Sequence, residues 1–243
     1  MELGLAGLQA VVTGGSGGIG AAVVLALAAE GCDVAFCARR QSGIDEMLRA
    51  TEALPGRVSA RALDVADTGG FADWLASIGR LDIFVPNVSA LSGDWAAAIA
   101  TDLQTTVACI EAALPPLQRS PTAALTFIGS KASSLAAPNS AAYGAVKAAL
   151  AHYMKSLSAR LLPGVRVNTV SPGDTLFHGG LWDRVQRDEP EAFARVLARN
   201  PMQRLASPDE IARVVAFVSS PAASFVAGAN WYVDGGSTAH VQF

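Results

Sequence analysis

Residues 13–20 read Thr13-Gly14-Gly15-Ser16-Gly17-Gly18-Ile19-Gly20, and they stand between an apolar run at 8–12 and an Ala-rich run at 21–30. We interpret this order as strand, turn and helix. Glycines permit a tight turn and let backbone amides approach a pyrophosphate, while the following helix directs its positive end at the same anion. In this context the spacing Gly15-x-Gly17-x-x-Gly20 predicts a dinucleotide-binding site.

The alternation of apolar runs continues along the rest of the chain. The predicted strands lie at 8–12, 33–37, 58–63, 81–85, 123–128, 165–170 and 230–233, and the predicted helices at 21–30, 44–54, 71–78, 95–117, 141–162 and 208–219. Strands that are apolar throughout and separated by helices are typical of a parallel, doubly wound sheet covered on both faces. A chain of 243 residues can bury one large core, so we expect a single α/β domain over residues 1–243.

Residues 174–203 interrupt this alternation with a helical insertion before the helix at 208–219. Insertions that follow the carboxyl end of a strand usually cover a ligand crevice, so we expect a substrate lid. Trp182 is as consistent with stacking on a substrate as with packing inside the lid, whereas Phe193 is expected to pack inside it. The segment also carries four arginines, which we expect to form a solvated helix face rather than a site for an acidic carrier: Arg184, Arg187, Arg195 and Arg199.

Charge and composition narrow the range of partners. Eighteen basic and 21 acidic residues give a net charge of −3, with no basic run that would bind nucleic acid or an anionic membrane. No leader pattern and no stretch long enough to span a bilayer is found, so we expect a soluble, cytoplasmic protein. Cys32, Cys37 and Cys109 stand in apolar surroundings, which suits buried thiols, and the scattered histidines predict no metal site.

The end of the second strand indicates which dinucleotide is bound. An NAD site carries an acidic residue there, which accepts a hydrogen bond from the ribose 2′-hydroxyl. Here Ala38 is followed by Arg39 and Arg40. A guanidinium binds a 2′-phosphate in bidentate fashion and stacks on adenine, so the sequence predicts NADP(H), with Arg39 as the stronger candidate. A pair of plain surface arginines is the alternative.

A second pattern, Tyr143-x-x-x-Lys147, lies in the helix predicted at 141–162, and Ser130 precedes the tyrosine by thirteen residues. Residues four apart share one helix face, so the Lys147 ammonium is expected beside the Tyr143 phenol. A neighbouring positive charge lowers the pKa of a tyrosine, which is ordinarily about 10. The pair alone is common on amphipathic helices, but with the glycine turn and Ser130 it predicts a proton-transfer centre.

Together these features resemble the short-chain dehydrogenase/reductase family, and particularly its 3-oxoacyl reductase-like members, along the whole chain. The matching segments are Thr13-Gly14-x-x-x-Gly18-x-Gly20, Asp64-Val65, Ser130 with Tyr143 and Lys147, Asn168, Ser171-Pro172-Gly173 and Val233-Asp234-Gly235-Gly236. The resemblance implies a Rossmann-type sheet of about seven strands. It also implies a homodimer or homotetramer, with residues 101–117 and 141–162 in the subunit contacts.

The resemblance further implies roles for individual residues. Tyr143 exchanges a proton with the substrate oxygen, Ser130 hydrogen-bonds that oxygen, and Lys147 holds the nicotinamide ribose while lowering the tyrosine pKa. The implied cofactor contacts are Thr13, Gly14, Ser16, Gly17, Gly18, Ile19, Gly20, Arg39, Arg40, Asp64, Val65, Asn87, Tyr143, Lys147, Pro172, Gly173 and Thr175.

Three departures from the family pattern stand near this centre. The usual Asn-Asn-Ala-Gly after the fourth strand is replaced by Pro86-Asn87-Val88-Ser89, which predicts a differently shaped loop beside the nicotinamide. The usual helix asparagine is replaced by Asp102, which either opposes the phenolate and relays protons or caps the helix after Thr101. Phe177 replaces the usual threonine, so Thr175 is the remaining candidate for holding the carboxamide.

These residues predict hydride transfer between NADP(H) and a small carbonyl compound or secondary alcohol. Reduction of a 3-oxoacyl compound or a cyclic ketone is the expected direction, because NADPH is the usual cellular donor. Two alternatives are a non-catalytic NADP-binding or regulatory protein, motivated by Pro86 and Asp102, and an NAD-linked alcohol dehydrogenase. The substrate pocket is predicted to be mostly apolar and lined by Ala132, Leu135, Ala137, Trp95, Leu176 and Trp182.

Overall fold

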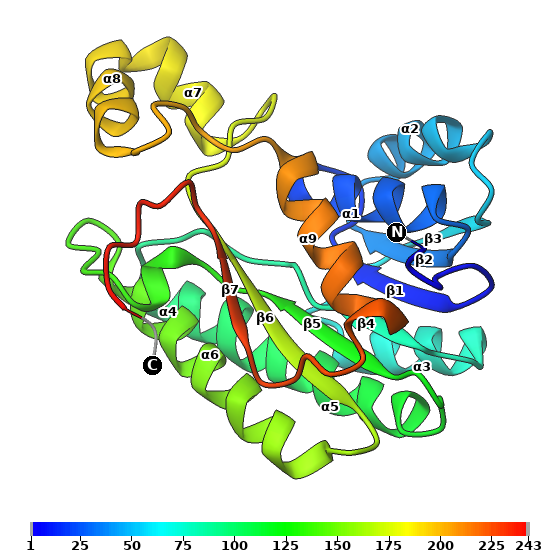
Figure 1. The fold of residues 1–243 in the computed structure, drawn as a ribbon. Coiled ribbons are helices and arrows are strands. Elements are labelled where there is room, and N and C mark those ends of the chain that lie inside the picture. The colour runs from blue at the N-terminus through cyan, green and yellow to red at the C-terminus, as the bar shows by residue number, and fades with distance from the viewer. Residues whose placement is uncertain (1, 242–243) are drawn as a thin grey trace.

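The computed structural model describes residues 2–241 as one α/β domain built on a seven-stranded parallel sheet (Figure 1). The strands are β1 (Gln9–Thr13), β2 (Asp33–Ala38), β3 (Val58–Ala62), β4 (Ile83–Val85), β5 (Ala124–Ile128), β6 (Arg166–Pro172) and β7 (Asn230–Val233). Their order is β3-β2-β1-β4-β5-β6-β7. The chain therefore winds from β1 out to β3 and returns to β4 on the other side of β1, which confirms the predicted doubly wound, Rossmann-type sheet.

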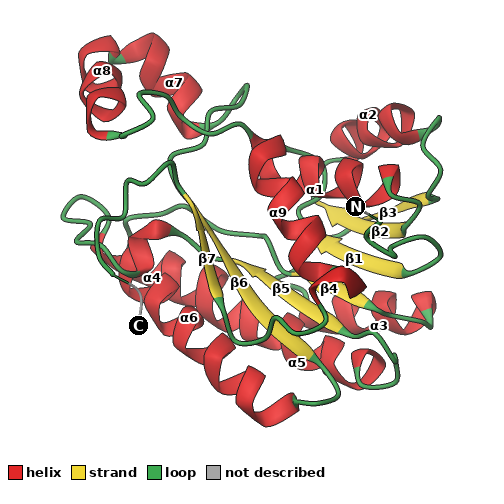
Figure 2. Cartoon of the chain, viewed as in Figure 1, coloured by secondary structure: helices red, strands yellow, loops and turns green. Residues whose placement is uncertain are grey.

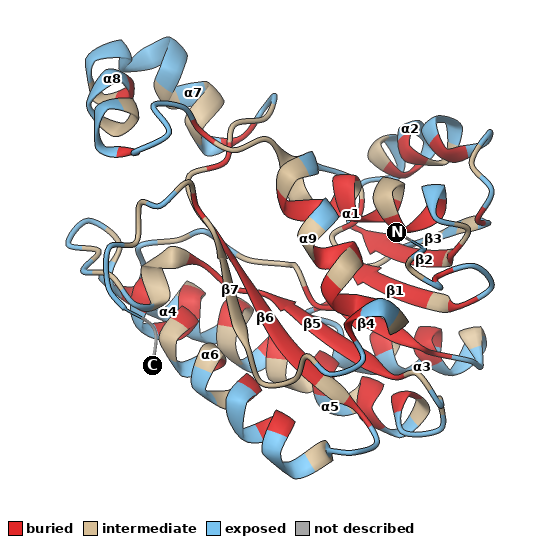
Figure 3. Cartoon of the chain, viewed as in Figure 1, coloured by how far each residue is buried: buried red, intermediate tan, exposed pale blue. Residues whose placement is uncertain are grey.

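Helices cover both faces of this sheet (Figure 2). The main ones are α1 (Gly18–Ala29), α2 (Gln41–Thr51), α3 (Thr68–Ile78), α5 (Thr106–Leu117), α6 (Ala141–Leu161) and α9 (Pro208–Ser219). One face packs against α1, α2 and α9 around Phe36, and the other against α3, α5 and α6 around Phe84 and Phe127. The five inner strands are buried apart from the first residue of β1, β2 and β6, whereas the edge strands β3 and β7 are partly exposed (Figure 3). Burial on both faces explains why the sequences of the inner strands do not alternate between apolar and polar residues.

Among the helices whose bounds differ from the prediction, two do so for an identifiable local reason. α3 begins at Thr68, before the predicted start at 71, because Asp67 caps it by accepting the Gly70 N–H at 3.0 Å. The long helix predicted at 95–117 is divided into α4 (Trp95–Ala97), the π-helical stretch η1 (Ala98–Thr105) and α5. A π-helix has a wider turn than an α-helix and often marks a functional site.

The 174–203 insertion contains two short helices, α7 (Leu181–Asp188) and α8 (Pro190–Arg199). They lie together beyond the carboxyl ends of β6 and β7 (Figure 1). The insertion leaves and rejoins the body at one paired point, where Thr175 and Ala206 form a parallel bridge and the Leu176 N–H donates to the Ala206 carbonyl at 2.8 Å. Among the described residues, the insertion is thus joined to the body by backbone pairing at its base, at Thr175, Leu176 and Ala206.

The three cysteines are buried free thiols, as predicted. Burial raises the pKa of each thiol to about 12, so Cys32, Cys37 and Cys109 stay protonated near neutral pH. Among the described residues, no helix has the length and apolar character needed to cross a membrane.

Candidate active site

Lys147 is more deeply buried than Ser130 and Tyr143, its two partners in the predicted catalytic trio. It lies in α6 with 2% of its surface exposed, and its ammonium donates a hydrogen bond to the carbonyl of Ile128, the last residue of β5, at 3.1 Å. The ammonium lies 4.9 Å from the centre of the Phe127 ring and 5.7 Å from the centre of the Tyr143 ring. A carbonyl and two aromatic rings thus hold the charge beside the phenol, where the helical spacing predicted it.

Ser130 approaches the same phenol from the loop after β5. Its hydroxyl oxygen accepts the Ala132 N–H at 3.1 Å at the start of η2 (Lys131–Ser133), which fixes the side chain. The residue is buried, and its interaction with Tyr143 works to lower the pKa of the phenol, against the larger effect of burial, which raises it. The structure therefore brings Ser130, Tyr143 and Lys147 together from one loop and one helix.

Burial works against a charge on both titratable groups of this trio. It raises the pKa of Tyr143 and lowers the pKa of Lys147 to about 8. Ser130 lowers the pKa of the phenol, whereas the negative charge of Asp102 raises the pKa of both groups. Burial outweighs the lowering that was expected for Tyr143, so at neutral pH the protein holds a protonated phenol beside a mostly charged ammonium.

Asp102 is buried inside η1, with 1% of its surface exposed. Its Oδ1 accepts the Ala90 N–H at 3.1 Å, which fastens the loop after β4, while its Oδ2 has no hydrogen-bond partner within the described residues 2–241. Because Asp102 lies within a continuous helical stretch, the alternative that it caps a helix after Thr101 is wrong. A buried acceptor without a partner is rare and costly, and in this fold it lies close enough to Lys147 and Tyr143 to act on both.

The glycine turn has the shape expected of a phosphate cradle. α1 begins at Gly18, inside the turn and earlier than predicted, and no side chain caps its first amides. A Cβ at Gly20 would lie 2.2 Å from the Gly14 carbonyl oxygen, whereas a Cβ at Gly17 would meet nothing within 4 Å. The turn is therefore closely packed at Gly20 and leaves space at Gly17, just before the helix begins. Ser16 and Ile19, which belong to the same turn, are half-buried. These residues fit a pyrophosphate bound at the helix start.

Thr13 and Asn87 join the loops after β1 and β4. The Asn87 side-chain amide donates to the Thr13 carbonyl at 3.0 Å, and the Asn87 N–H donates to the Thr13 hydroxyl at 2.9 Å. Pro86 keeps its carbonyl in the fold by accepting the Ile128 N–H at 3.1 Å. Thr13 and Asn87, both predicted to contact the cofactor, thus hold the two loops of the cradle together. The replacement of the usual asparagine by Pro86 leaves these hydrogen bonds between the loops intact.

Arg39 and Arg40 directly follow β2 and are both exposed. Within residues 2–241 neither guanidinium has a carboxylate within 4 Å, since no salt bridge of the described chain includes them. Of the adenine-side pair, Val65 is buried, whereas Asp64 is exposed and accepts the Ala66 N–H at 3.0 Å. The positive charges therefore stand open to solvent at the strand end where the 2′-phosphate was predicted.

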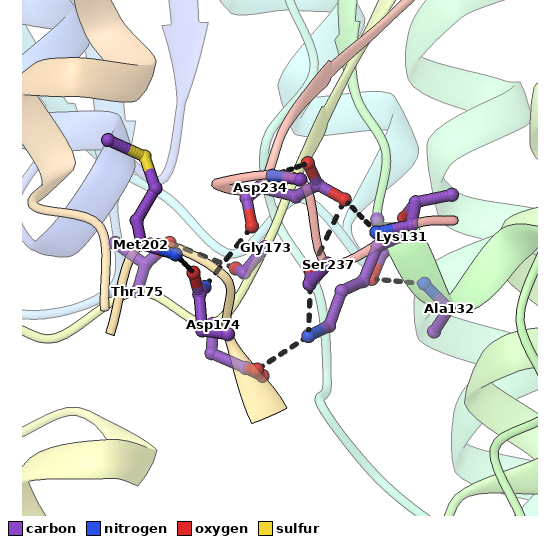
Figure 4. A network of polar contacts seen from close by, with 12 residues as sticks. Lys131, Ala132, Gly173, Asp174, Thr175, Met202, Asp234 and Ser237 are labelled. Atoms are coloured by element: carbon purple, nitrogen blue, oxygen red, sulfur yellow. Dashed lines mark hydrogen bonds and ion pairs between the residues drawn. The ribbon is translucent and has the colours of Figure 1, made fainter. Parts of the chain in front are cut away.

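The other side of the candidate site is a polar network that ties together the loops after β5, β6 and β7 (Figure 4). The Lys131 ammonium pairs with Asp174 at 2.5 Å and lies 3.4 Å from the Ser237 hydroxyl, which in turn donates to Asp234 at 3.2 Å. Sequence reasoning missed Lys131, although its position directly after Ser130 was an available signal. The network fastens the start of the insertion to the loop that carries Ser130.

Pro172, Gly173 and Thr175 lie where β6 passes into the insertion. A Cβ at Gly173 would stand 2.7 Å from the Asp234 Cα, so this position needs glycine for close packing of the loop after β7. The buried Thr175 hydroxyl donates to the Gly173 carbonyl at 3.1 Å. The Thr175 hydroxyl oxygen can still accept a hydrogen bond, but the hydroxyl proton is already donated to the backbone.

The residues predicted to line the substrate pocket separate into two groups. Ala132, Leu135 and Ala137 line one hollow of about 450 Å³, which continues along α6 past Ala141 and Gly144. The other three, Trp95, Leu176 and Trp182, do not line this hollow.

The second group and the remaining insertion residues lie toward the outside of the molecule. Trp95 is 55% exposed at the start of α4, and Trp182 is half-buried in α7. Phe193 is buried, as expected for packing within the insertion. The four arginines of α7 and α8 are exposed, and two of them form helical pairs, Arg187 with Asp183 and Arg195 with Glu191.

Comparison with known proteins agrees with this geometry. The family described as enoyl-(acyl carrier protein) reductase matches residues 14–238. The chain belongs to the short-chain dehydrogenase/reductase family. Isoepoxydon dehydrogenase of Penicillium expansum is 34% identical, with 100% of this chain and 99% of the relative aligned. Cis-4-hydroxycyclohexanecarboxylate dehydrogenase of Sinomonas cyclohexanicum is also 34% identical, over 95% of this chain and 96% of the relative.

Solved structures of this family have the same fold and several contain the cofactor. L-sorbose reductase of Gluconobacter frateurii, complexed with NADPH and L-sorbose, has a TM-score of 0.91 at 26% identity and covers 99% of this chain and 100% of its own. The NADP complex of Pseudomonas aeruginosa RhlG has a TM-score of 0.88 at 28% identity, with 98% of each chain covered. The chain is thus an oxidoreductase that depends on a nicotinamide dinucleotide, and the expected NADP(H) agrees with these neighbours.

Proposed function

We propose that this protein is an NADPH-dependent carbonyl reductase in which Tyr143 is the proton donor. The observation that carries the proposal is the protonated, half-buried phenol of Tyr143 beside the buried ammonium of Lys147. Because burial raises its pKa, the phenol carries its proton near neutral pH, and a proton available for donation is what reduction of a carbonyl requires. The opposite reaction would need the phenolate, which burial disfavours.

The trio divides the work as follows. The reduced nicotinamide, when bound, supplies the hydride that the carbonyl carbon accepts. Ser130 donates a hydrogen bond to the substrate oxygen, so negative charge that develops there is stabilised before it fully forms. Tyr143 donates its proton to the same oxygen, which yields the secondary alcohol. Lys147 keeps a positive charge beside Tyr143, which stabilises the phenolate left by the proton transfer.

Arg39 supports NADPH over NADH as the donor. Its exposed guanidinium, together with that of Arg40, stands at the end of β2, where an acidic residue would favour a free ribose. A bidentate contact between a guanidinium and the 2′-phosphate would strengthen the binding of NADPH but not of NADH, which lacks that phosphate. The proposed cofactor contacts are the glycine turn, the two arginines, Asp64 and Val65 on the adenine side, and Pro172, Gly173 and Thr175 on the nicotinamide side.

The substrate class that fits is a compact, largely apolar ketone. The hollow that begins at Ala132, two residues after Ser130, is lined mostly by Ala132, Leu135, Ala137 and the small residues of α6. No arginine or lysine is among its lining residues, and neither are Ser130, Tyr143 and Lys147. The name of one relative, cis-4-hydroxycyclohexanecarboxylate dehydrogenase, specifies a ring-bearing secondary alcohol. Cyclic ketones are therefore the first substrates to test, with 3-oxoacyl esters second.

Asp102 is proposed as a positioning residue rather than a catalytic one. Its carboxylate holds the loop after β4 through Ala90, and its Oδ2, which has no partner among residues 2–241, lies in the same buried region as Lys147. A negative charge there helps to keep Lys147 protonated against the effect of burial. We further propose that the exposed faces of η1, α5 and α6 form the contacts of a homodimer or homotetramer, and that the 174–203 insertion covers the substrate.

The test is a turnover screen of purified protein with NADPH and with NADH against cyclic ketones and 3-oxoacyl esters. We expect oxidation of NADPH in the presence of a ketone, a loss of about 10²- to 10⁴-fold in kcat for Tyr143→Phe, and a much smaller change in the NADPH affinity of that variant, since Tyr143 is only one of many implied cofactor contacts. Arg39→Ala should weaken NADPH by about tenfold or more and leave NADH unaffected. NADPH binding without any turnover, equal in wild type and Tyr143→Phe, would favour a non-catalytic or regulatory protein. Equal use of both cofactors would favour an NAD-linked alcohol dehydrogenase.

A further inference from the structure

Phe177 reaches from the insertion onto the glycine turn. A Cβ built at Gly18 would lie 2.8 Å from the tip of the Phe177 ring, and a Cβ built at Gly180 would lie 2.9 Å from the same carbon. The ring tip is therefore held between two glycines that are far apart in the sequence, and any side chain at either position would displace it. Gly18 is the first residue of α1, and Gly180 is the residue just before α7.

The local backbone fixes the ring in this place. Leu176, the preceding residue, is tied to Ala206 at the base of the insertion, so Phe177 is the first residue beyond the paired backbone. The Gly180 N–H donates to the Phe177 carbonyl at 3.0 Å, which closes a tight turn and brings Gly180 under the ring. The insertion thus enters its first helix through a turn whose aromatic side chain rests on the cofactor cradle.

The start of α1 is also where a dinucleotide must present its pyrophosphate, because the uncapped amides and the positive helix end are directed there. We propose that Phe177 is a gate on the cofactor site: the ring and the pyrophosphate compete for the start of α1, and the ring must leave Gly18 for the dinucleotide to bind. Since the ring is part of the entrance to α7, its departure also moves the start of the insertion. This inference rests on dinucleotide binding at the glycine turn and not on which ketone is reduced.

The gate has a kinetic consequence. A ligand that binds only the open form has an apparent affinity reduced by the fraction of protein in that form. If the ring leaves Gly18 for roughly a tenth to a fifth of the time, removing it should raise the association rate constant of NADPH about five- to tenfold. The dissociation rate constant should stay the same, because the ring is away from the cradle in the bound state.

The test measures association and dissociation of NADPH by stopped-flow fluorescence in the full-length protein. Phe177→Ala removes the ring, whereas Gly180→Ala keeps the ring and pushes it from its place. Gly180 has φ −77° and ψ 177°, so alanine is compatible with its backbone. Leu181→Ala is the matched control, since Leu181 is an exposed apolar residue at the start of the same helix, outside the glycine contacts.

The gate predicts faster association in both Phe177→Ala and Gly180→Ala and no change in Leu181→Ala. Unchanged or slower association in the first two variants would overturn it, and so would faster dissociation, which would mean that the ring holds the bound cofactor. Gly180→Ala keeps the aromatic ring, so an effect seen in both variants cannot come from a folding defect caused by loss of the ring. Because the readout is cofactor binding, a protein that binds NADPH but reduces no ketone would contradict the proposed function and still decide the gate.

Discussion

The cofactor cradle and the 174–203 insertion meet at the same edge of the sheet, yet they are held in place in different ways. α1, which carries the cradle, buries six of its residues in the core beneath it: Gly20, Ala22, Val23, Val24, Leu27 and Ala28. In the insertion α7 buries none and α8 buries only Phe193. The insertion is fastened instead by its paired base, by Lys131 with Asp174, and by Phe177 on Gly18. Near its other end, the buried side-chain amide of Asn200 donates to the Asp234 carbonyl at 3.2 Å. The cradle is fixed by close packing, whereas the insertion is fixed by a few contacts that a ligand can replace.

This difference suggests a division of roles. A feature buried in the core has little freedom to change, because interiors are densely packed and a single added methyl group must displace its neighbours. A segment held by a few contacts at its base can move as one body and can change in sequence without harm to the fold. We therefore expect substitutions at the closely packed positions of the cradle to affect stability and cofactor binding together, and substitutions on the outer face of the insertion to affect neither.

The largest expected effect is that of Gly20→Ala. Its Cβ would stand 2.2 Å from the Gly14 carbonyl oxygen and 2.6 Å from the Asn87 side-chain amide, so the turn must shift. We expect the free energy of unfolding to fall by about 1–3 kcal/mol or more, with loss of NADPH binding. Urea denaturation without ligand measures the first effect and fluorescence titration the second.

Gly17→Ala is the matched control for stability. Gly17 has φ −166°, which any residue adopts, and a Cβ there meets nothing within 4 Å. Its free energy of unfolding should stay within about 0.5 kcal/mol of wild type. Equal stability of the two alanine variants would contradict the view that packing fixes the cradle.

A smaller effect is expected from Asp102→Asn, measured as the pH dependence of kcat/KM for reduction. The charge of Asp102 raises the pKa of Tyr143, and reduction needs the protonated phenol. Removing the charge lowers that pKa, so the alkaline limb of the profile should move to lower pH. The pKa of Lys147 should also fall below its value of about 8, because the same charge raises it.

The amide oxygen of Asp102→Asn can still accept the Ala90 N–H, so the loop after β4 should stay in place. Asp188→Asn removes the same charge from an exposed position in α7 and should leave the profile unchanged. A profile that does not move in Asp102→Asn would exclude Asp102 from the mechanism.

The smallest effect is expected from Arg195→Ala on the insertion. Arg195 lies 4.0 Å from Glu191, and both side chains are exposed, so solvent screens the pair. Urea denaturation should give a free energy of unfolding within about 0.5 kcal/mol of wild type, and kcat/KM for a cyclic ketone should not change. A marked rise in KM for an acidic, carrier-bound substrate would instead indicate that this face of the insertion contacts the carrier.

The sequence alone was sufficient for the parts of this protein that depend on local patterns. The continuous apolar strands predicted a two-sided parallel sheet, the glycine turn between strand and helix predicted its cradle, and the spacing of Tyr143 and Lys147 predicted their proximity. The boundaries were less accurate where a side chain decides them, as with Asp67 at the start of α3. The division of the helix at 95–117 was missed because apolar periodicity does not reveal a π-helical turn.

Only the tertiary structure decided what surrounds the reacting groups. Burial, which depends on the whole chain, reversed the expected direction of the Tyr143 pKa and placed Asp102 inside η1 rather than at a helix cap. The contacts of Lys131 with Asp174 and of Phe177 with Gly18 join residues separated by 43 or more positions, and no local pattern encodes such pairs. Sequence periodicity determines which face of an element is apolar, whereas the packing of distant elements determines which charges are desolvated and which side chains touch.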